Sequence, residues 1–296
     1  MDADRLLTAW QQARSEGLNN RAVAAKLGLS EAGLIASGCG RFVTRLLPDA
    51  AALLRGLPRL GKVKAVVRNS VAVLERVGTV HAVVSGAIGS ILVAADSFEM
   101  LCEIAQWKRA FALREESTHG HGLKLSVQFF TVEGTSAAKF FLPHGSDAHA
   151  FAQLTGAFAS LDQSSQEPID FAPERLSLPW GRPTPAAPDA LLAFLQAAAQ
   201  SRPPLTFVVR NRAACLYASK AIEHVKRSDR GGWVNVLDEG MDVHLHESRI
   251  PYLRYASDFG SDGRWLHWYS DQQAIALSVR SSQGWRALTA SAGAAA

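Results

Sequence analysis

Residues 66–83 read VVRNSVAVLERVGTVHAV, and residues 208–225 repeat the pattern as VVRNRAACLYASKAIEHV. The two copies align without a gap, so that Arg68 and Asn69 match Arg210 and Asn211. A repeat at so long a spacing predicts two whole domains of one kind, not a solenoid of short units.

Length and composition agree with two globular domains. The chain has 296 residues, of which 48% are hydrophobic and 20% are charged, and domains commonly hold about 150 residues each. Such a composition is typical of a globular protein with a sizeable core. The net charge of +4 is compatible with an anionic ligand, but a modest excess of surface arginine explains it equally well.

The three cysteines, Cys39, Cys102 and Cys215, follow no metal-binding spacing, and their odd number argues against a disulfide framework. The N-terminal stretch carries early acidic residues and lacks the apolar segment of a signal peptide. The sequence contains no run of about 18 apolar residues that could span a membrane. We therefore expect a cytoplasmic protein without membrane insertion.

The strand and helix patterns predict an α+β fold built from two tandem structural repeats. In each repeat, short valine-rich strands broken by glycine form a largely antiparallel sheet with flanking helices. We expect the two sheets to be related by a pseudo-twofold axis. The predicted boundaries are a first repeat with an N-terminal helical cap at 1–161, a proline-rich linker at 162–188 and a second repeat at 189–296.

Several local signals are more specific. Asn19 or Asn20 and Ser30 are predicted helix N-caps, and Asp189 is predicted to cap the helix that follows it. Gly134 marks a hairpin turn, as does the glycine-rich stretch that contains His119 and His121. The segment SFEMLCEIAQW, residues 97–107, fits either a helix or a strand.

Residues 21–37, RAVAAKLGLSEAGLIAS, have the outline of a helix-turn-helix, with a turn at Gly28. The second helix carries no Arg, Lys, Gln or Asn that could read base edges. We therefore favour a structural helical cap and expect no nucleic-acid partner. A DNA-binding regulator stays open as an alternative.

The sequence contains no nucleophile elbow, P-loop, dinucleotide fingerprint or HExxH motif, so no catalytic residue is assigned. His244 and His246 alternate with Leu245 along a predicted strand, which turns both imidazoles to one face. Two such imidazoles could ligate a metal or an iron porphyrin, although exposed strand faces often carry histidines without a ligand. Aromatic residues of the second repeat could stack on a flat ligand or fill the core; they are Trp233, Trp265, Trp268 and Tyr269.

The order of these motifs along nearly the whole chain resembles the bacterial hemin-degrading, haem-utilisation factors, the HemS-like family. The segments that carry the resemblance are residues 22–46, 60–78, 111–117, 125–142, 161–171, 190–212 and 231–247. The resemblance implies a cytoplasmic protein that receives haem after import. Several members of the family open the ring with an external electron donor and release iron. The implied partners are haem, a haem importer and a reductase, and a homodimer is left open.

The resemblance also implies a haem site between the two halves, formed by a histidine at the start of the second half and an arginine opposite. That histidine lies in the family between a tryptophan like Trp180 and a helix like the one starting at Asp189. Here the stretch is shortened, and no histidine occurs between His149 and His224. The position of the arginine falls near Leu101.

His244 occupies the corresponding place in the second repeat. We therefore expect a protein that binds or handles haem in iron acquisition, by transport or degradation, with His244 and His246 as candidate ligands of the haem iron. Oxygenase activity with an external reductant is left open, because the usual axial histidine is missing. The alternative is a family member that has lost haem binding and acts through protein contacts.

Overall fold

The computed structural model describes residues 3–116, 122–167, 183–229, 231–257 and 264–281, with the single residues 288 and 290. The predicted turn at His119 and His121 and the position of Trp180 lie outside these residues. The contacts divide the chain into two compact units. The first unit comprises Met1–Ala65, Gly78–Asp96 and Leu101–Pro173, and the second comprises Val66–Val77, Ser97–Met100 and Glu174–Ala296.

The elements of the two repeats follow each other in a related but not identical order. The first part of the chain contains α1 (Ala3–Ser15), α2 (Asn20–Lys26), α3 (Glu31–Ala36), β1 (Val43–Leu46), α4 (Ala50–Gly56), η1 (Leu57–Leu60), β2 (Lys62–Arg68), β3 (Ala72–Ser85), η2 (Ala87–Gly89), β4 (Ser90–Ala95), β5 (Phe98–Glu103), η3 (Ile104–Gln106), β6 (Arg109–Glu116), β7 (Leu123–Phe130), β8 (Ser136–Phe141) and α5 (Ala148–Ala157). The second part contains β9 (Thr184–Pro185), α6 (Ala190–Ser201), β10 (Leu205–Arg210), β11 (Ala214–Lys220), β12 (Val225–Arg227), β13 (Trp233–Asp238), β14 (Met241–His246), η4 (Glu247–Arg249), β15 (Tyr252–Ser257), β16 (Arg264–Tyr269) and β17 (Ile275–Ser281). The predicted α+β fold of two tandem repeats is confirmed.

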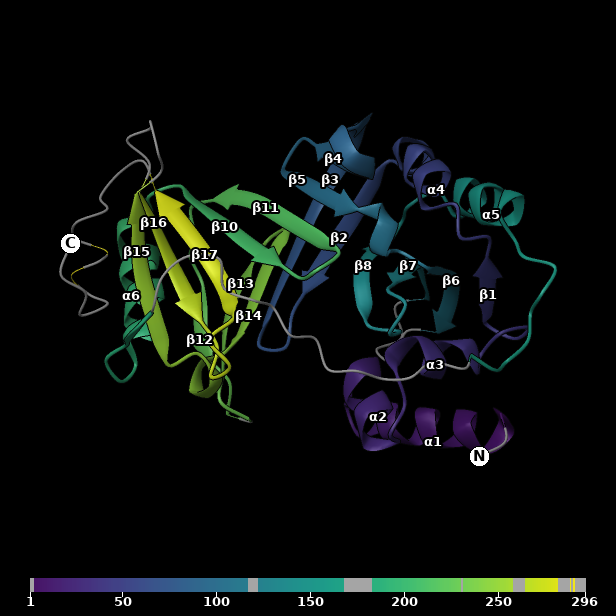
Figure 1. Cartoon of the computed structure of the whole chain (residues 1–296), viewed down its shortest axis with the longest axis horizontal. Helices are drawn as coiled ribbons and strands as arrows, with labels where there is room; N and C mark the ends of the chain where they lie inside the picture. The colour runs from purple at the N-terminus through teal and green to yellow at the C-terminus, as the bar shows by residue number, and fades with distance from the viewer. Residues whose placement is uncertain are drawn as a thin grey trace. The chain divides into compact units, whose positions relative to one another are not determined.

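In the first unit, β1, β6, β7 and β8 form an antiparallel sheet in that order. The helices α1–α3, purple in Figure 1, pack on this sheet. Their buried side chains share one hydrophobic cluster with Phe111, Leu113 and Phe130. Five of the six residues of α3 are buried, so this helix covers the sheet and presents little surface. The helical-cap interpretation is confirmed.

In the second unit, β15, β16, β17, β10 and β11 form one antiparallel sheet. Helix α6 lies on one face of it (Figure 1), where Phe194 packs edge-on against Trp268 at a ring-centroid distance of 6.2 Å. A further antiparallel set runs β12, β13, β14 and the first half of β3, residues Ala72–Arg76. A strand segment from the first repeat thus completes the sheet that carries the predicted histidines.

The duplicated Arg-Asn pair has a structural role. Asn69 donates its side-chain amide to the backbone carbonyls of Arg210 and Ala276, at 3.1 and 2.9 Å. Asn211 returns the bond by donating to the carbonyl of Arg68 at 3.0 Å. Each Asn oxygen also accepts two backbone N–H groups of its own tight turn. Both asparagines are buried, where unpaired backbone groups would be costly, so the two copies satisfy each other.

Most local predictions agree with the structure. Asn19 and Ser30 cap their helices, and Gly134, at φ 71°, closes the β7–β8 turn. The ambiguous segment 97–107 is strand β5 followed by the short 3-10 helix η3.

The predicted cap at Asp189 is wrong. The residue has a left-handed backbone, φ 58°, and its carboxylate caps no N–H of α6 but pairs with Arg227. Among the described residues, no helix combines the length and the apolar character needed to cross a bilayer.

Candidate functional site

The two predicted histidines lie on β14 and share one face. His244 and His246 are half-buried, whereas Leu245 between them is fully buried. This alternation follows the two-residue period of a strand and confirms that both imidazoles point to the same side. Among the described residues, no three His, Cys, Asp or Glu side chains gather as a metal-ion cluster, so any metal here would have to bring its other ligands.

His244 has a defined hydrogen-bond partner. Its Nδ1 lies 2.8 Å from the side-chain oxygen of Asn235, its neighbour across the β13–β14 ladder. The amide oxygen of Asn235 accepts from Nδ1 of His244, so the neutral imidazole carries its proton on Nδ1 and keeps a lone pair on Nε2. Metal-ligating histidines are commonly oriented by such a bond at the second ring nitrogen.

His246 has a different environment. Its Nδ1 lies 3.1 Å from the hydroxyl oxygen of Ser248, and its ring packs against Trp233 with centroids 4.9 Å apart. His244 and His246 project in parallel from positions two residues apart, a separation of about 6.6 Å along a strand.

The surface around His244 is partly apolar. Val73 of β3 and Asn235 of β13 flank His244 on the two neighbouring strands. Trp233 and Val73 are half-buried, and Leu237 is 44% exposed. An exposed apolar side chain on a strand face is open to contact with a planar ligand.

The first repeat has no equivalent ligand. Leu101 holds on β5 the place that His244 holds on β14, because each lies three residues before the short 3-10 helix that follows. Its neighbour Cys102 is fully buried, and burial raises the pKa of the Cys102 thiol above its ordinary value. A protonated thiol is a poor metal ligand, so Cys102 does not supply the donor that Leu101 lacks.

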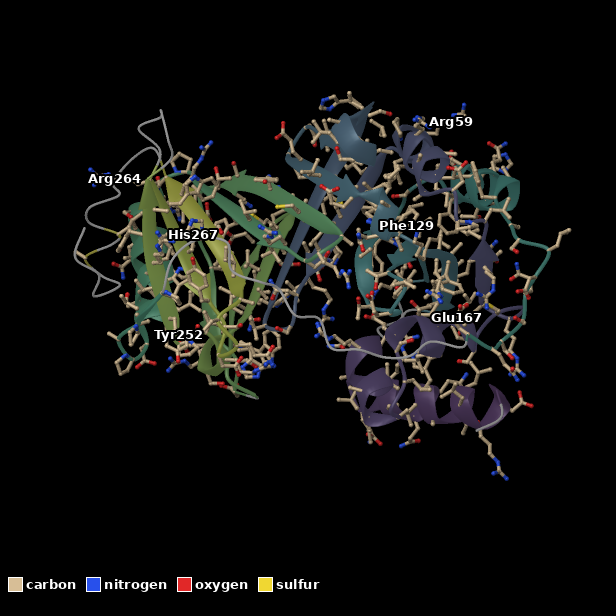
Figure 2. All side chains as sticks on the ribbon, in the orientation of Figure 1. Arg59, Phe129, Glu167, Tyr252, Arg264 and His267 are labelled. Atoms are coloured by element: carbon tan, nitrogen blue, oxygen red, sulfur yellow. The ribbon has the colours of Figure 1, made fainter. Side chains whose placement is uncertain are left out.

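A second group of rings lies on β16 and brings His267, which the sequence did not single out, next to Trp265. Trp265 and His267 are stacked at an interplanar angle of 6°, with centroids 6.1 Å apart, and Arg280 lies 5.2 Å above the Trp265 ring. Nδ1 of His267 is 2.7 Å from the hydroxyl oxygen of Ser278. Figure 2 shows His267 and Tyr252 on this part of the second unit. The alternation in WLHWY, residues 265–269, is the only sequence signal for this row.

The structure separates the aromatic residues that the sequence grouped together. Trp268 and Tyr269 are fully buried, and Trp268 packs against α6, so it belongs to the core. Trp233 and Trp265 remain half-exposed on strand faces. Asn235, the partner of His244, went unnoticed in the sequence, because only strand pairing brings it opposite the histidine.

Comparison with known proteins finds similarity over part of the chain. A model of the haemin-degrading HemS.ChuX domain matches residues 28–158. The hemin transport protein HmuS of Yersinia pestis is 34% identical over 155 residues, 52% of this chain and 44% of that protein. The hemin transport protein HemS of Yersinia enterocolitica is 32% identical over 165 residues, 55% of this chain and 47% of that protein. The matched part thus spans less than half of either relative.

Among solved structures, holo-PhuS, a heme-binding protein from Pseudomonas aeruginosa, has the same fold. The two chains superpose with a TM-score of 0.86 at 24% identity, covering 97% of this chain and 98% of that one. At this level of identity the likeness establishes the fold across both repeats.

Proposed function

We propose that this chain, a HemS-like member of the bacterial haem-utilisation family, binds haem and handles it in iron acquisition. Three findings support the proposal: the HemS.ChuX domain at residues 28–158, two curated relatives that are hemin transport proteins, and the shared fold with a heme-binding protein. The resemblance of the sequence to cytoplasmic haem-utilisation factors favours the cytoplasm as the place of action.

The observation that carries the proposal is the hydrogen bond between His244 Nδ1 and Asn235. It leaves Nε2 of His244 with a lone pair on a half-exposed strand face, which is the form of imidazole that ligates iron. We propose that His244 would be the ligand of the haem iron. His246 would contact the edge of the ring, or would take the place of His244 as the ligand. Apolar contact from Val73, Leu237 and Trp233 would bury part of the porphyrin.

This assignment accounts for the missing family histidine. By the resemblance, the family's histidine lies in the stretch that is shortened here before α6, and the family's arginine falls near Leu101. A ligand on β14 would move the iron to the second repeat's own strand face. Haem bound there would supply one-electron and oxygen chemistry, while the chain would hold it through His244 and orient that imidazole through Asn235. Whether the ring is only carried or also opened is then decided by access of a reductant.

Hemin titration followed by absorbance spectroscopy tests the proposal. We expect a saturable Soret band that shifts in His244→Ala, shifts less in His246→Ala, and is unchanged in His149→Ala, a matched control on the exposed side of α5. Addition of ascorbate to the complex then separates carriage from degradation, because loss of the Soret band with iron release reports ring opening. A non-saturable band, equal in all variants, would contradict the proposal.

That outcome would favour the alternative, a family member that no longer binds haem and acts through protein contacts. A shortened segment before α6 and the absence of a donor at Leu101 are the observations that keep this alternative in view. Its positive test is a stable complex with a haem importer or a reductase at a defined stoichiometry, formed equally well by His244→Ala.

A further inference from the structure

The strand face that carries His244 changes in polarity from one strand to the next. Residues that are paired directly across antiparallel strands project to the same side of a sheet. The printed register therefore places one residue from each of β12, β13, β14 and β3 in a single row on this face, in the order Lys226, Asn235, His244 and Val73. The row begins with an ammonium group and ends with an apolar side chain, and the imidazole lies between them.

Lys226 is the one fixed positive charge that the register places on this face within the described residues. Its side chain is exposed, and it makes no hydrogen bond or ion pair with another described residue. The next residue, Arg227, projects to the other face, where it pairs with Asp189 and Glu247. Neighbouring strands lie about 4.8 Å apart, so two spacings, about 10 Å, separate the backbones of Lys226 and His244.

The other sides of His244 offer an anionic group no donor of comparable strength. Asp242, two residues before His244 on β14, lies directly opposite Glu75 of β3. Ionised carboxylates only accept hydrogen bonds, so neither of them can bind a second carboxylate. Val73 and Leu237 are apolar, and the burial of hydrocarbon against them is favourable. The face is thus suited to a ligand that is anionic at one edge and apolar at the other.

Haem has this distribution of groups, because its two propionates extend from one edge of the ring and its vinyl groups lie toward the opposite edge. Given the haem site of the proposed function, on which this inference rests, we propose that Lys226 binds a haem propionate and so fixes the orientation of the ring. The propionate accepts a charge-assisted hydrogen bond from Nζ of Lys226. The propionate edge then lies toward β12, and the apolar edge lies over Val73.

Hemin and hemin dimethyl ester, which lacks both free carboxylates, are the two probes, and the readout is the Soret titration. We expect Lys226→Ala to weaken hemin binding about fivefold, because pairs of exposed charges contribute little. The same variant should bind the ester as tightly as the unchanged protein does. Lys226→Arg keeps the charge and should retain the affinity for hemin.

Two controls accompany these titrations. Lys62→Ala removes another exposed lysine, at the start of β2, and should change the affinity for neither porphyrin. Salt should reduce the effect of Lys226→Ala on hemin binding, because screening weakens the interaction between exposed charges.

The dependence of binding on His244 separates this inference from the haem proposal. If neither porphyrin gives a saturable Soret band that shifts in His244→Ala, both proposals fail. If that band is present but Lys226→Ala binds hemin as tightly as the unchanged protein, only the role of Lys226 fails. An equal loss of affinity for hemin and for the ester would also overturn that role, because Lys226 would then act without the propionates.

Discussion

Asn235 is the residue on which the behaviour of His244 depends most. Its side-chain oxygen fixes the imidazole in the form that protonates Nδ1 and frees Nε2. The histidine alone would populate both tautomers and several ring orientations. A hydrogen bond between neighbouring strands thus orients the ring of His244, so that Nε2 of the neutral imidazole could donate its lone pair to a metal.

We predict that Asn235→Leu weakens hemin binding by about 10-fold to 100-fold, the usual effect of losing the partner of a metal-ligating histidine. Asn235→Asp is the matched control, because a carboxylate also accepts from Nδ1, and it should retain the affinity. Hemin titration at constant pH measures both variants. Equal hemin affinities of Asn235→Leu and the unchanged protein would contradict the proposal that His244 ligates the haem iron.

A second prediction at the residue scale concerns the contribution of Asn69 to stability. Asn69→Ala removes two donated bonds and leaves two buried backbone N–H groups without their acceptor. We expect a loss of about 2–4 kcal/mol in the free energy of unfolding, measured by urea denaturation, and a similar loss for Asn211→Ala. Gln12→Ala on the exposed side of α1 should change the free energy by less than about 0.5 kcal/mol.

At the scale of elements, the start of the predicted linker, residues 162–167, is held on β1 and β6 by side chains that include the carboxylate of Glu167. Glu167 accepts from Arg109 Nε at 2.6 Å and also pairs with Arg45. Burial acts to raise the pKa of Glu167, but the hydrogen bonds from the two arginines outweigh it, so the pKa lies below its ordinary value. The folded protein therefore binds this proton more weakly than the unfolded chain does.

It follows that Glu167 stabilises the fold above its unfolded pKa, and that this stabilisation is lost as the pH falls through the lower folded pKa. We predict that Glu167→Gln unfolds more easily at neutral pH and loses less stability between neutral and acid pH than the unchanged protein. Urea midpoints across that range measure the difference. Parallel pH curves for the two proteins would show that Glu167 makes no such contribution.

The helical cap contains a second element-scale prediction. Glu31 at the start of α3 pairs with Lys139 of β8, and both side chains are at least nine-tenths buried. Glu31→Ala would leave a buried, unpaired ammonium group, at a cost of about 3–5 kcal/mol. The double variant Glu31→Leu, Lys139→Met removes both charges and should recover much of that loss, as urea denaturation can test.

At the scale of the whole molecule, the two repeats are alike in fold and unlike in chemistry. The second repeat carries His244 with its partner Asn235, whereas the equivalent position of the first repeat is Leu101. In the first repeat the ring of Trp107 packs against Phe129. In the second repeat Ile250 follows η4 as Trp107 follows η3, and it lines a cavity together with Trp268. Equivalent positions of the two repeats thus carry different side chains on similar sheets.

The haem proposal consequently predicts one haem per chain. Titration with hemin should reach its end point at one equivalent, and pyridine haemochrome analysis of the purified complex should give the same ratio. Two equivalents that both shift in His244→Ala would contradict the assignment of one ligand to one repeat.

The sequence by itself determined the architecture of this protein. The repeated stretches that begin at Val66 and Val208 imply two similar domains. The alternation of residues along the strand predicts that His244 and His246 lie on one face. Such features are local, because they depend on periodicity within a few residues and on turn chemistry.

Only the tertiary structure decided what those residues meet. The pairing of β3 with β14, the bond from His244 to Asn235, the ion pair of Arg227 with Asp189, and the cavity that Ile250 and Trp268 line all join residues distant in sequence. Their positions depend on strand register and on packing between segments, which no local pattern encodes.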